Sequence, residues 1–271
     1  MIDCNKVKVI LFDLDGTIYQ DTDFHRDYIQ TLVTDTPYQV WEKELVTFSD
    51  EVLRGKHLQM NCFYQEKTLE FSSFAEYVLK IEELLVPDVS FEEYYQNKVE
   101  GLCFLGDAWS VVTLIAVTLG LREERGNYAF LSIREKMMAE NLPLNMELIR
   151  AVTELKKKYT TILLSNSPYQ TAFDFVKKLG FQEAFTYMSF ESGKPNALQE
   201  KLLEFVPNAC QDFGSLLSIG DHALNEIINV QILGGQTIWM SPYQGIHEPQ
   251  YDLKLRSLDE LASFLIKNLI D

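Results

Sequence analysis

The sequence predicts an α/β protein, with a mainly parallel sheet flanked by helices and an all-helical block inserted into the chain. Residues 7–12 form a short apolar, β-branched-rich run, which is typical of a strand buried on both faces. After residue 144, strand and helix patterns alternate with short connections, which indicates βαβ units. We therefore predict a core domain, made of residues 1–19 and 144–271, and a helical domain of residues 20–143.

Two carboxylates close the first predicted strand. Asp13 and Asp15 lie two residues apart, so in an extended chain both side chains point the same way. Carboxylates at the end of a buried strand are costly unless they are compensated, and Mg²⁺ prefers such hard oxygen ligands. Gly16 lets the backbone turn, and Thr17 offers a hydroxyl and an amide to an anion. A lone D-x-D is also typical of a polar turn with a capping aspartate, and the partners further along the chain decide between the two interpretations.

The inserted block shows helical periodicity and no convincing strand. Five helices are predicted there, near residues 41–53, 74–81, 91–99, 109–121 and 128–138. Ser90 and Glu93 form a capping box for the third of them. The fourth is mostly apolar, but it is shorter than the about 20 residues that cross a bilayer, and charged residues bound it. We therefore expect a buried helix there, not a membrane span.

The core pattern contains five strands with helices between them. The strands are predicted at residues 7–12, 160–164, 184–190, 215–219 and 236–240. Ser167 can cap the helix after the second strand, and Pro168 suits its first turn. Pro195 is expected to open a further helix, and Ser257 with Glu260 forms a capping box for the last one.

Polar residues follow these strands. Because right-handed crossovers place the carboxyl ends of parallel strands on one rim, we expect the polar residues to gather there. The rim residues are Asp13, Asp15, Ser165, Lys194 and Asp221. The sequence has neither the G-x-G-x-x-G nor the G-x-x-x-x-G-K-[ST] pattern, so dinucleotide and P-loop interpretations lack their motif.

Composition excludes several classes of partner. The chain has 24 Lys and Arg against 40 Asp and Glu, a formal net charge of −16, so it has no general attraction for nucleic acid. A phosphorylated substrate would need a local cation to correct that field. The four cysteines are scattered without a C-x-x-C pair, and the first residues contain no apolar signal segment, so we expect a cytoplasmic protein without a membrane partner.

The stretch DLDGT at residues 13–17, following an apolar strand, resembles motif I of the haloacid dehalogenase (HAD) superfamily of phosphohydrolases and relatives. The family's further motifs are a Ser or Thr closing a second strand, a Lys, and an acidic pair after a third strand. Their counterparts here are Ser165, Lys194, and Asp221 with Glu226. Glu226 departs from the pattern, since the family commonly has a second Asp there. The resemblance implies a Rossmann-like HAD core, with the inserted block in the position of a mobile helical cap that would exclude water and select the substrate.

The resemblance also implies roles for the acids. Asp13 would be the nucleophile that forms an aspartyl-phosphate, and Asp15 the general acid for the leaving group and then the base for water. Mg²⁺ would be bound by the Asp13 carboxylate, the Asp15 backbone carbonyl and Asp221.

The remaining residues would serve the phosphate. Ser165 and the backbone near Asn166 would hold it, Thr17 would support the first loop, and Lys194 would balance the negative charge. The longer Glu226 side chain would reach the metal, a metal-bound water or Lys194.

We therefore expect a Mg²⁺-dependent phosphohydrolase for a small phosphorylated metabolite. A sugar phosphomutase with the same site and a non-catalytic phosphoacceptor or regulatory module are the alternatives. A dehalogenase is disfavoured because Asp15 and the metal site serve phosphoryl chemistry, and a phosphonatase would need a cap lysine that no motif marks. No motif indicates the oligomeric state.

Overall fold

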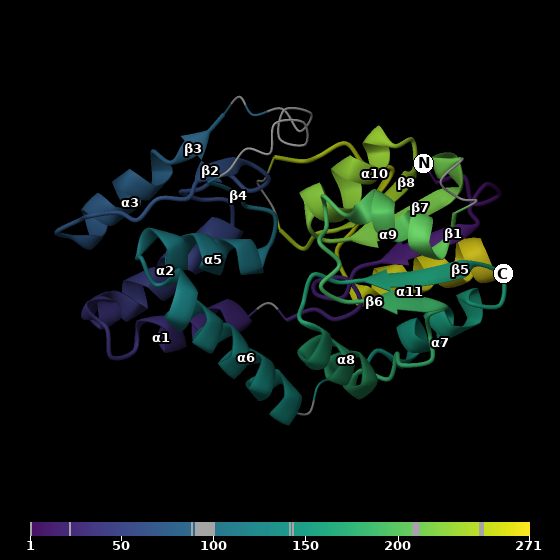
Figure 1. Ribbon diagram of the computed structural model, residues 1–271, viewed down its shortest axis with the longest axis horizontal. Helices are drawn as coiled ribbons and strands as arrows, with labels where there is room; N and C mark the ends of the chain where they lie inside the picture. The colour runs from purple at the N-terminus through teal and green to yellow at the C-terminus, as the bar shows by residue number, and fades with distance from the viewer. Residues whose placement is uncertain are drawn as a thin grey trace. The chain divides into compact units, whose positions relative to one another are not determined.

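The structure is a computed structural model that describes residues 2–21, 23–87, 89, 101–140, 142, 144–207, 212–243 and 247–271. The chain forms two compact units (Figure 1). We call them the core unit (Met1–Gln20, Asn141–Pro242 and Pro249–Asp271) and the insert unit (Asp21–Glu140 and Tyr243–Glu248). Of the residues that we predicted to be part of the core, Tyr243, His247 and Glu248 belong to the insert unit.

The core unit is built on a six-stranded sheet in which all neighbouring strands are parallel. Its order is β6-β5-β1-β7-β8-β9, and Figure 1 labels the first five of these strands. The strands are β1 (Val9–Phe12), β5 (Thr160–Leu164), β6 (Tyr187–Ser189), β7 (Leu216–Gly220), β8 (Gln236–Met240) and β9 (Leu253–Leu255). The predicted parallel α/β fold is confirmed. The sixth strand, β9, was not predicted, because three half-buried residues carry no recognisable pattern.

Strand β1 occupies the point where the strand order reverses. Val9 is paired with Thr160 on β5 and with Leu216 on β7, so β1 lies between the two directions of winding. Ligands of open α/β sheets bind outside the carboxyl ends of the strands at such a reversal. The residues that follow β1 therefore lie where an open α/β sheet binds its ligand.

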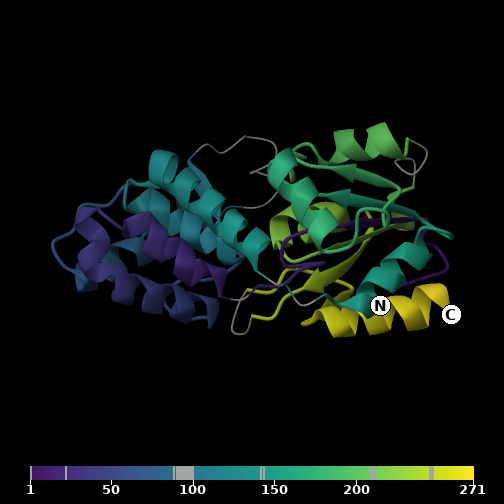
Figure 2. The same cartoon turned by 90° about the horizontal axis from the view of Figure 1, so that it is seen from below.

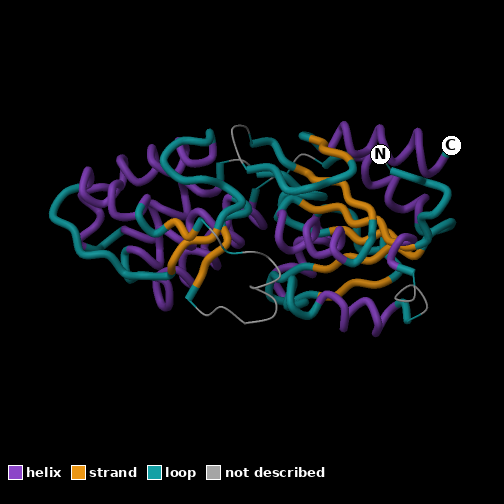
Figure 3. Tube along the Cα trace, turned by 90° about the horizontal axis from the view of Figure 1, so that it is seen from above, coloured by secondary structure: helices purple, strands orange, loops and turns teal. Residues whose placement is uncertain are grey.

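Helices cover both faces of this sheet. The α-helices of the core unit are α7 (Met146–Leu155), α8 (Tyr169–Lys178), α9 (Leu198–Phe205), α10 (Asn229–Ile232) and α11 (Leu258–Leu265). Helices α7 and α11 pack together on one side of the sheet, and α9 lies on the other (Figures 2 and 3). The Ser257 hydroxyl accepts a hydrogen bond from the Glu260 amide at 3.2 Å and caps α11, but the Glu260 carboxylate accepts from the Arg256 amide at 2.7 Å, so only half of the predicted capping box forms.

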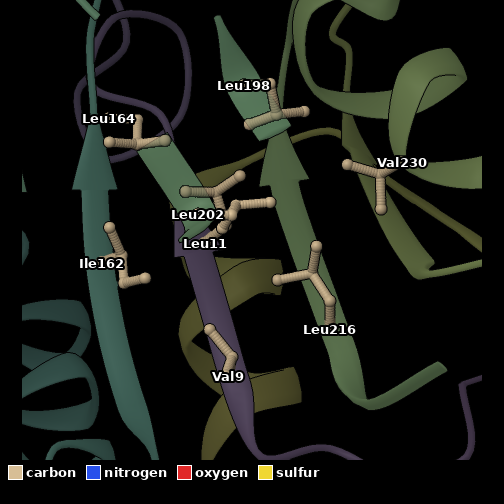
Figure 4. Close-up of a cluster of buried hydrophobic side chains, with 8 residues drawn as sticks. All are labelled: Val9, Leu11, Ile162, Leu164, Leu198, Leu202, Leu216 and Val230. Carbon is tan, nitrogen blue, oxygen red and sulfur yellow. The ribbon is translucent and has the colours of Figure 1, made fainter. Parts of the chain in front are cut away.

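The α9 face of the sheet carries a buried aliphatic cluster (Figure 4). It consists of Val9, Leu11, Ile162, Leu164, Leu198, Leu202, Leu216 and Val230. On β1, Val9 and Leu11 belong to this cluster, and the Phe12 ring contacts Phe185 instead, with ring centroids 5.6 Å apart. All four residues of β1 are buried, which confirms a strand covered on both faces.

The insert unit contains helices and a small sheet. Its α-helices are α1 (Phe24–Val33), α2 (Glu42–Leu53), α3 (Phe74–Glu82), α5 (Ala108–Thr118) and α6 (Asn127–Ala139). Four of these match predicted helices, and α1 was not predicted. The helix predicted at 91–99, with its capping box of Ser90 and Glu93, lies outside the described residues. Within the described parts of the chain, no helix is both long and apolar enough to cross a membrane.

The expectation of an all-helical insertion was wrong. Three strands, β2 (Phe63–Gln65), β3 (Leu85–Val86) and β4 (Leu102–Phe104), form an antiparallel sheet in the order β3-β2-β4. Each strand is two or three residues long, which is too short for an alternating pattern to emerge from the sequence.

Candidate active site

The loop after β1 is fixed against β7. The Asp13 amide donates a hydrogen bond to the Ile219 carbonyl at 3.0 Å, which continues the strand pairing to the start of the acidic stretch. Leu14 is buried, and Gly16 turns the chain with a φ of 76°, a left-handed conformation that favours glycine. The two acids therefore leave the sheet at its carboxyl edge, beside the reversal of strand order.

A buried lysine joins this loop to two other segments. Lys194 Nζ donates to Asp13 Oδ1 at 2.7 Å, to Glu226 Oε1 at 2.7 Å and to the Leu164 carbonyl at 2.6 Å. An ammonium has three donors, so these bonds use all of them. The side chains of Lys194 and Glu226 are each 1% exposed, and that of Asp13 is 13% exposed. The structure thus brings Asp13, Lys194 and Glu226 together, and we call them the buried ionic trio.

Electrostatics keeps the lysine charged. Burial by itself lowers the pKa of the Lys194 ammonium, but Asp13 and Glu226 raise that pKa above its ordinary value. Burial raises the pKa of the Asp13 carboxyl, and the Lys194 ammonium opposes that shift. One ammonium faces two carboxylates, so the ionised trio carries one unbalanced negative charge. A further cation close to Asp13 would balance it.

Glu226 is a partner of Lys194. Its second oxygen, Oε2, accepts a hydrogen bond from the His222 amide at 3.1 Å. Gly220 leaves room for this side chain, because a Cβ there would lie 2.2 Å from Glu226 Cγ. The contact with Lys194 is one of those expected for the longer glutamate.

Asp221 lies against the loop that follows β1. A Cβ built on Gly16 would lie 1.9 Å from Asp221 Oδ2, so the carboxylate occupies the space above the Gly16 backbone. The Trp239 indole donates to the Asp221 carbonyl at 2.8 Å and holds this residue at the end of β7. Asp221 is therefore a neighbour of the Asp15–Thr17 backbone.

The residues after β5 organise the other side of the loop. The Ser165 hydroxyl is buried and accepts a hydrogen bond from the Ser167 amide at 3.1 Å. The Asn166 side chain accepts from the Lys194 amide at 2.9 Å and donates to the Lys194 carbonyl at 2.8 Å. The Asn166 side chain thus holds the segment that carries Lys194.

Ser167 contacts Asp15. Its hydroxyl donates to Asp15 Oδ2 at 3.0 Å, and the N-cap of α8 is Pro168, whose side chain makes no capping hydrogen bond. The structure places Pro168, not Ser167, at the N-cap, so the predicted capping position of Ser167 was wrong by one residue. This contact was not predicted, although the position of Ser167 two residues beyond Ser165 is a signal that could have indicated it.

The oxygen donors here fit Mg²⁺. Within the described residues, no three His, Cys, Asp or Glu side chains form a ready-made metal cluster. Mg²⁺ often binds to only one or two carboxylates and keeps several waters, so Asp13 and Asp221 with a backbone carbonyl are a suitable donor set. The Thr17 hydroxyl is fully buried and has no hydrogen-bond partner among the described residues, which is the state expected of a group that awaits a ligand.

Gly16→Ala is expected to lower the free energy of unfolding by about 1–3 kcal/mol and to weaken Mg²⁺ binding about 10- to 100-fold. The added methyl group would displace the Asp221 carboxylate. The two measurements are chemical denaturation and calorimetric titration with MgCl₂. Gly234→Ala is the matched control, since Gly234 has a φ of 86° and no atom lies within 4 Å of the position that its added methyl group would take. Equal Mg²⁺ affinity in the two variants would remove Asp221 from the metal site.

Comparison with known proteins gives three findings. The family model described as haloacid dehalogenase-like hydrolase matches residues 7–204, a range that includes Asp13, Ser165 and Lys194. No curated protein sequence matches the chain. Among solved structures, a proposed HAD-hydrolase, YfnB from Bacillus subtilis bound to magnesium, is similar with a TM-score of 0.55 at 15% identity, over 96% of this chain and 98% of that one.

A second similar solved structure is a dehalogenase. The L-2-haloacid dehalogenase from Xanthobacter autotrophicus, with chloropropionic acid covalently bound, has a TM-score of 0.51 at 11% identity, over 96% of this chain and 99% of that one. At these identities both structures support the fold alone.

Proposed function

The chain belongs to the haloacid dehalogenase-like hydrolases, and from that premise we propose that it is a Mg²⁺-dependent phosphohydrolase acting on a small phosphorylated metabolite. One observation carries the proposal: the buried ammonium of Lys194 bonds to Asp13 at 2.7 Å, at the carboxyl end of the central strand. A nucleophilic carboxylate beside a fixed cation suits attack on a phosphoryl group, whose transition state gains most from positioning and positive charge.

Asp13 is the nucleophile in this proposal. One carboxylate oxygen attacks phosphorus and forms an aspartyl-phosphate, while the bond between phosphorus and the leaving oxygen breaks. The Lys194 bond to Oδ1 orients the carboxylate and favours its ionised form against the effect of burial. Lys194 itself is held by Glu226, so its charge stays in place as negative charge moves onto the phosphoryl oxygens.

Asp15 moves the protons. It gives a proton to the leaving oxygen and later takes one from the water that attacks the aspartyl-phosphate, which releases phosphate and restores Asp13. The Ser167 hydroxyl, bonded to Oδ2 at 3.0 Å, fixes the orientation of the Asp15 carboxyl group.

The phosphate has three candidate donors. Ser165 accepts a hydrogen bond from the Ser167 amide, so the proton of its own hydroxyl is available to an anion. The buried Thr17 hydroxyl and the backbone near Asn166 are the others. Mg²⁺ held by the Asp13 and Asp221 carboxylates and the Asp15 carbonyl would supply the charge neutralisation that the buried ionic trio and the phosphate both need.

Chelation is expected to remove activity. With 4-nitrophenyl phosphate as substrate, EDTA should lower kcat/KM at least about 100-fold, and added MgCl₂ should restore it, because the metal supplies several kcal/mol of charge stabilisation. Phosphate release is the measurement, followed by a panel of phosphorylated metabolites.

Each alternative has its own outcome in the same assay. Chloride release from 2-chloropropionate without phosphate release from any ester would indicate a dehalogenase. Isomer formation from a sugar phosphate without phosphate release would indicate a mutase. Failure to turn over any ester, with Mg²⁺ still bound, would indicate a phosphoacceptor or regulatory module.

A further inference from the structure

Three aromatic rings form a cluster in the core unit, which we call the aromatic platform: the exposed Tyr169 and the half-buried Phe173 and Phe190. The rings of Tyr169 and Phe173 are parallel, with centroids 5.7 Å apart and an interplanar angle of 3°. Phe190 meets both of them edge-on, at 5.6 Å from Tyr169 and 6.4 Å from Phe173. Tyr169 is 55% exposed, an unusual amount for a large ring that belongs to a packed cluster.

The platform adjoins the proposed phosphate site along the chain. Tyr169 begins α8 two residues after Ser167, whose hydroxyl contacts Asp15. Two residues span at most about 7 Å, so the Tyr169 backbone lies within that distance of Ser167. Tyr169 and Phe173 lie on α8, and Phe190 directly follows β6; Figure 1 labels both elements.

Hydrogen bonds beyond the strand ends bring Phe190 to the same place. The Ser192 amide donates to the Ser165 carbonyl and the Glu191 amide to the Ser167 carbonyl, both at 3.0 Å. The segment after β6 therefore runs beside the segment after β5, with Phe190 next to the bonded Glu191. The platform is thus anchored on both of the segments that supply Ser165, Ser167 and Lys194.

We propose that the aromatic platform receives a planar aromatic group attached to the phosphate, so that the substrate class is an aromatic phosphomonoester. This inference rests on the proposed function. Rings stack on or pack edge-to-face against other rings, and the exposed Tyr169 offers such a contact on the segment of Ser167, whose hydroxyl bonds to Asp15, the proposed acid for the leaving group. The three side chains of the platform carry no charge, and the chain has a net charge of −16. A leaving group that carries negative charges in addition to the phosphate is therefore disfavoured.

A purely structural role is the competing explanation. Tyr169 and Phe173 are four residues apart on α8, so their contact also stabilises the helix. A similar stack exists at the other end of β6, where the 40% exposed Tyr187 lies on Phe205 with centroids 5.0 Å apart and an interplanar angle of 16°. The pair of Tyr187 and Phe205 provides a matched control, because Tyr187 begins β6 whereas Phe190 follows its end.

The test is calorimetric titration in MgCl₂ with two non-hydrolysable probes, phenylphosphonate and methylphosphonate. The wild-type protein is expected to bind phenylphosphonate about 3- to 10-fold more tightly than methylphosphonate, the range typical of one aromatic contact. Tyr169→Ala should abolish that difference and leave methylphosphonate binding unchanged. Tyr169→Phe, which keeps the ring, and Tyr187→Ala should both retain the difference.

Several outcomes would overturn the inference. These are equal binding of the two phosphonates by the wild type, no binding of either, and a preference for phenylphosphonate that survives in Tyr169→Ala or is lost in Tyr187→Ala. The proposed function fails separately, through the absence of Mg²⁺-dependent turnover of 4-nitrophenyl phosphate. A Tyr169-dependent preference without turnover would leave the platform as a ligand site and reject the phosphohydrolase.

Discussion

Asp13→Asn is expected to lower kcat for phosphate esters by about 10⁴-fold or more, the scale of losing a covalent nucleophile. The amide has the shape of the carboxylate but is neutral and a poor nucleophile towards phosphorus. The substitution also removes a charge from the proposed Mg²⁺ site, so metal affinity should fall with it. Steady-state turnover of 4-nitrophenyl phosphate and titration with MgCl₂ measure the two effects.

The fold should survive this substitution. Lys194 keeps its bonds to Glu226 and the Leu164 carbonyl, and in the variant one ammonium faces one buried carboxylate, which is a balanced pair. Asp252→Asn is the matched control. The Asp252 carboxylate accepts a hydrogen bond from the Thr237 amide at 2.9 Å near the start of β8 and β9, at the end of the sheet opposite to Asp13. This variant should retain turnover. Metal-dependent turnover above about 1% of wild type in Asp13→Asn, far more than loss of a nucleophile permits, would remove Asp13 from that role.

The sequence predicted the parts of the site that follow from topology. The apolar run before Asp13 identifies a strand buried on both faces, and the alternating strands and helices after residue 144 imply parallel neighbours. Those two inferences are sufficient to bring Lys194 near Asp13, 181 positions earlier in the chain, because parallel strands end on one rim.

The sequence could not predict which partner each side chain takes. Ser167 has the pattern of a helix cap, yet the N-cap of α8 is Pro168, and the Ser167 hydroxyl donates to Asp15 across two loops, a contact that no local pattern records. The sequence leaves the partner of Glu226 open, and the structure shows its carboxylate bonded to Lys194, in the space that Gly220 leaves. The short strands β2, β3 and β4 depend on pairing across the insert unit, which no local pattern records.

Lys194→Met is expected to lower the free energy of unfolding by about 3–5 kcal/mol, because it leaves two buried carboxylates without their cation. Turnover should fall at least about 100-fold, as expected for loss of a fixed charge beside the reacting group. Chemical denaturation in EDTA isolates the effect of the ionic trio from that of bound metal. Lys201→Met is the matched control, since Lys201 pairs with the exposed Glu204 at 3.1 Å on the surface of α9, and little change is expected there.

A second substitution separates the stability of the ionic trio from its chemistry. In Lys194→Met with Glu226→Gln, one unpaired carboxylate becomes a neutral amide, whose oxygen can still accept the His222 amide. We expect this pair of changes to recover about 1–3 kcal/mol of the lost stability, the cost of one unsatisfied buried group. Turnover should remain lost, because neither change restores a cation beside Asp13. If Lys194→Met costs no more stability than Lys201→Met, or if the double variant regains turnover, then Lys194 does not hold the charge that the proposed mechanism assigns to it.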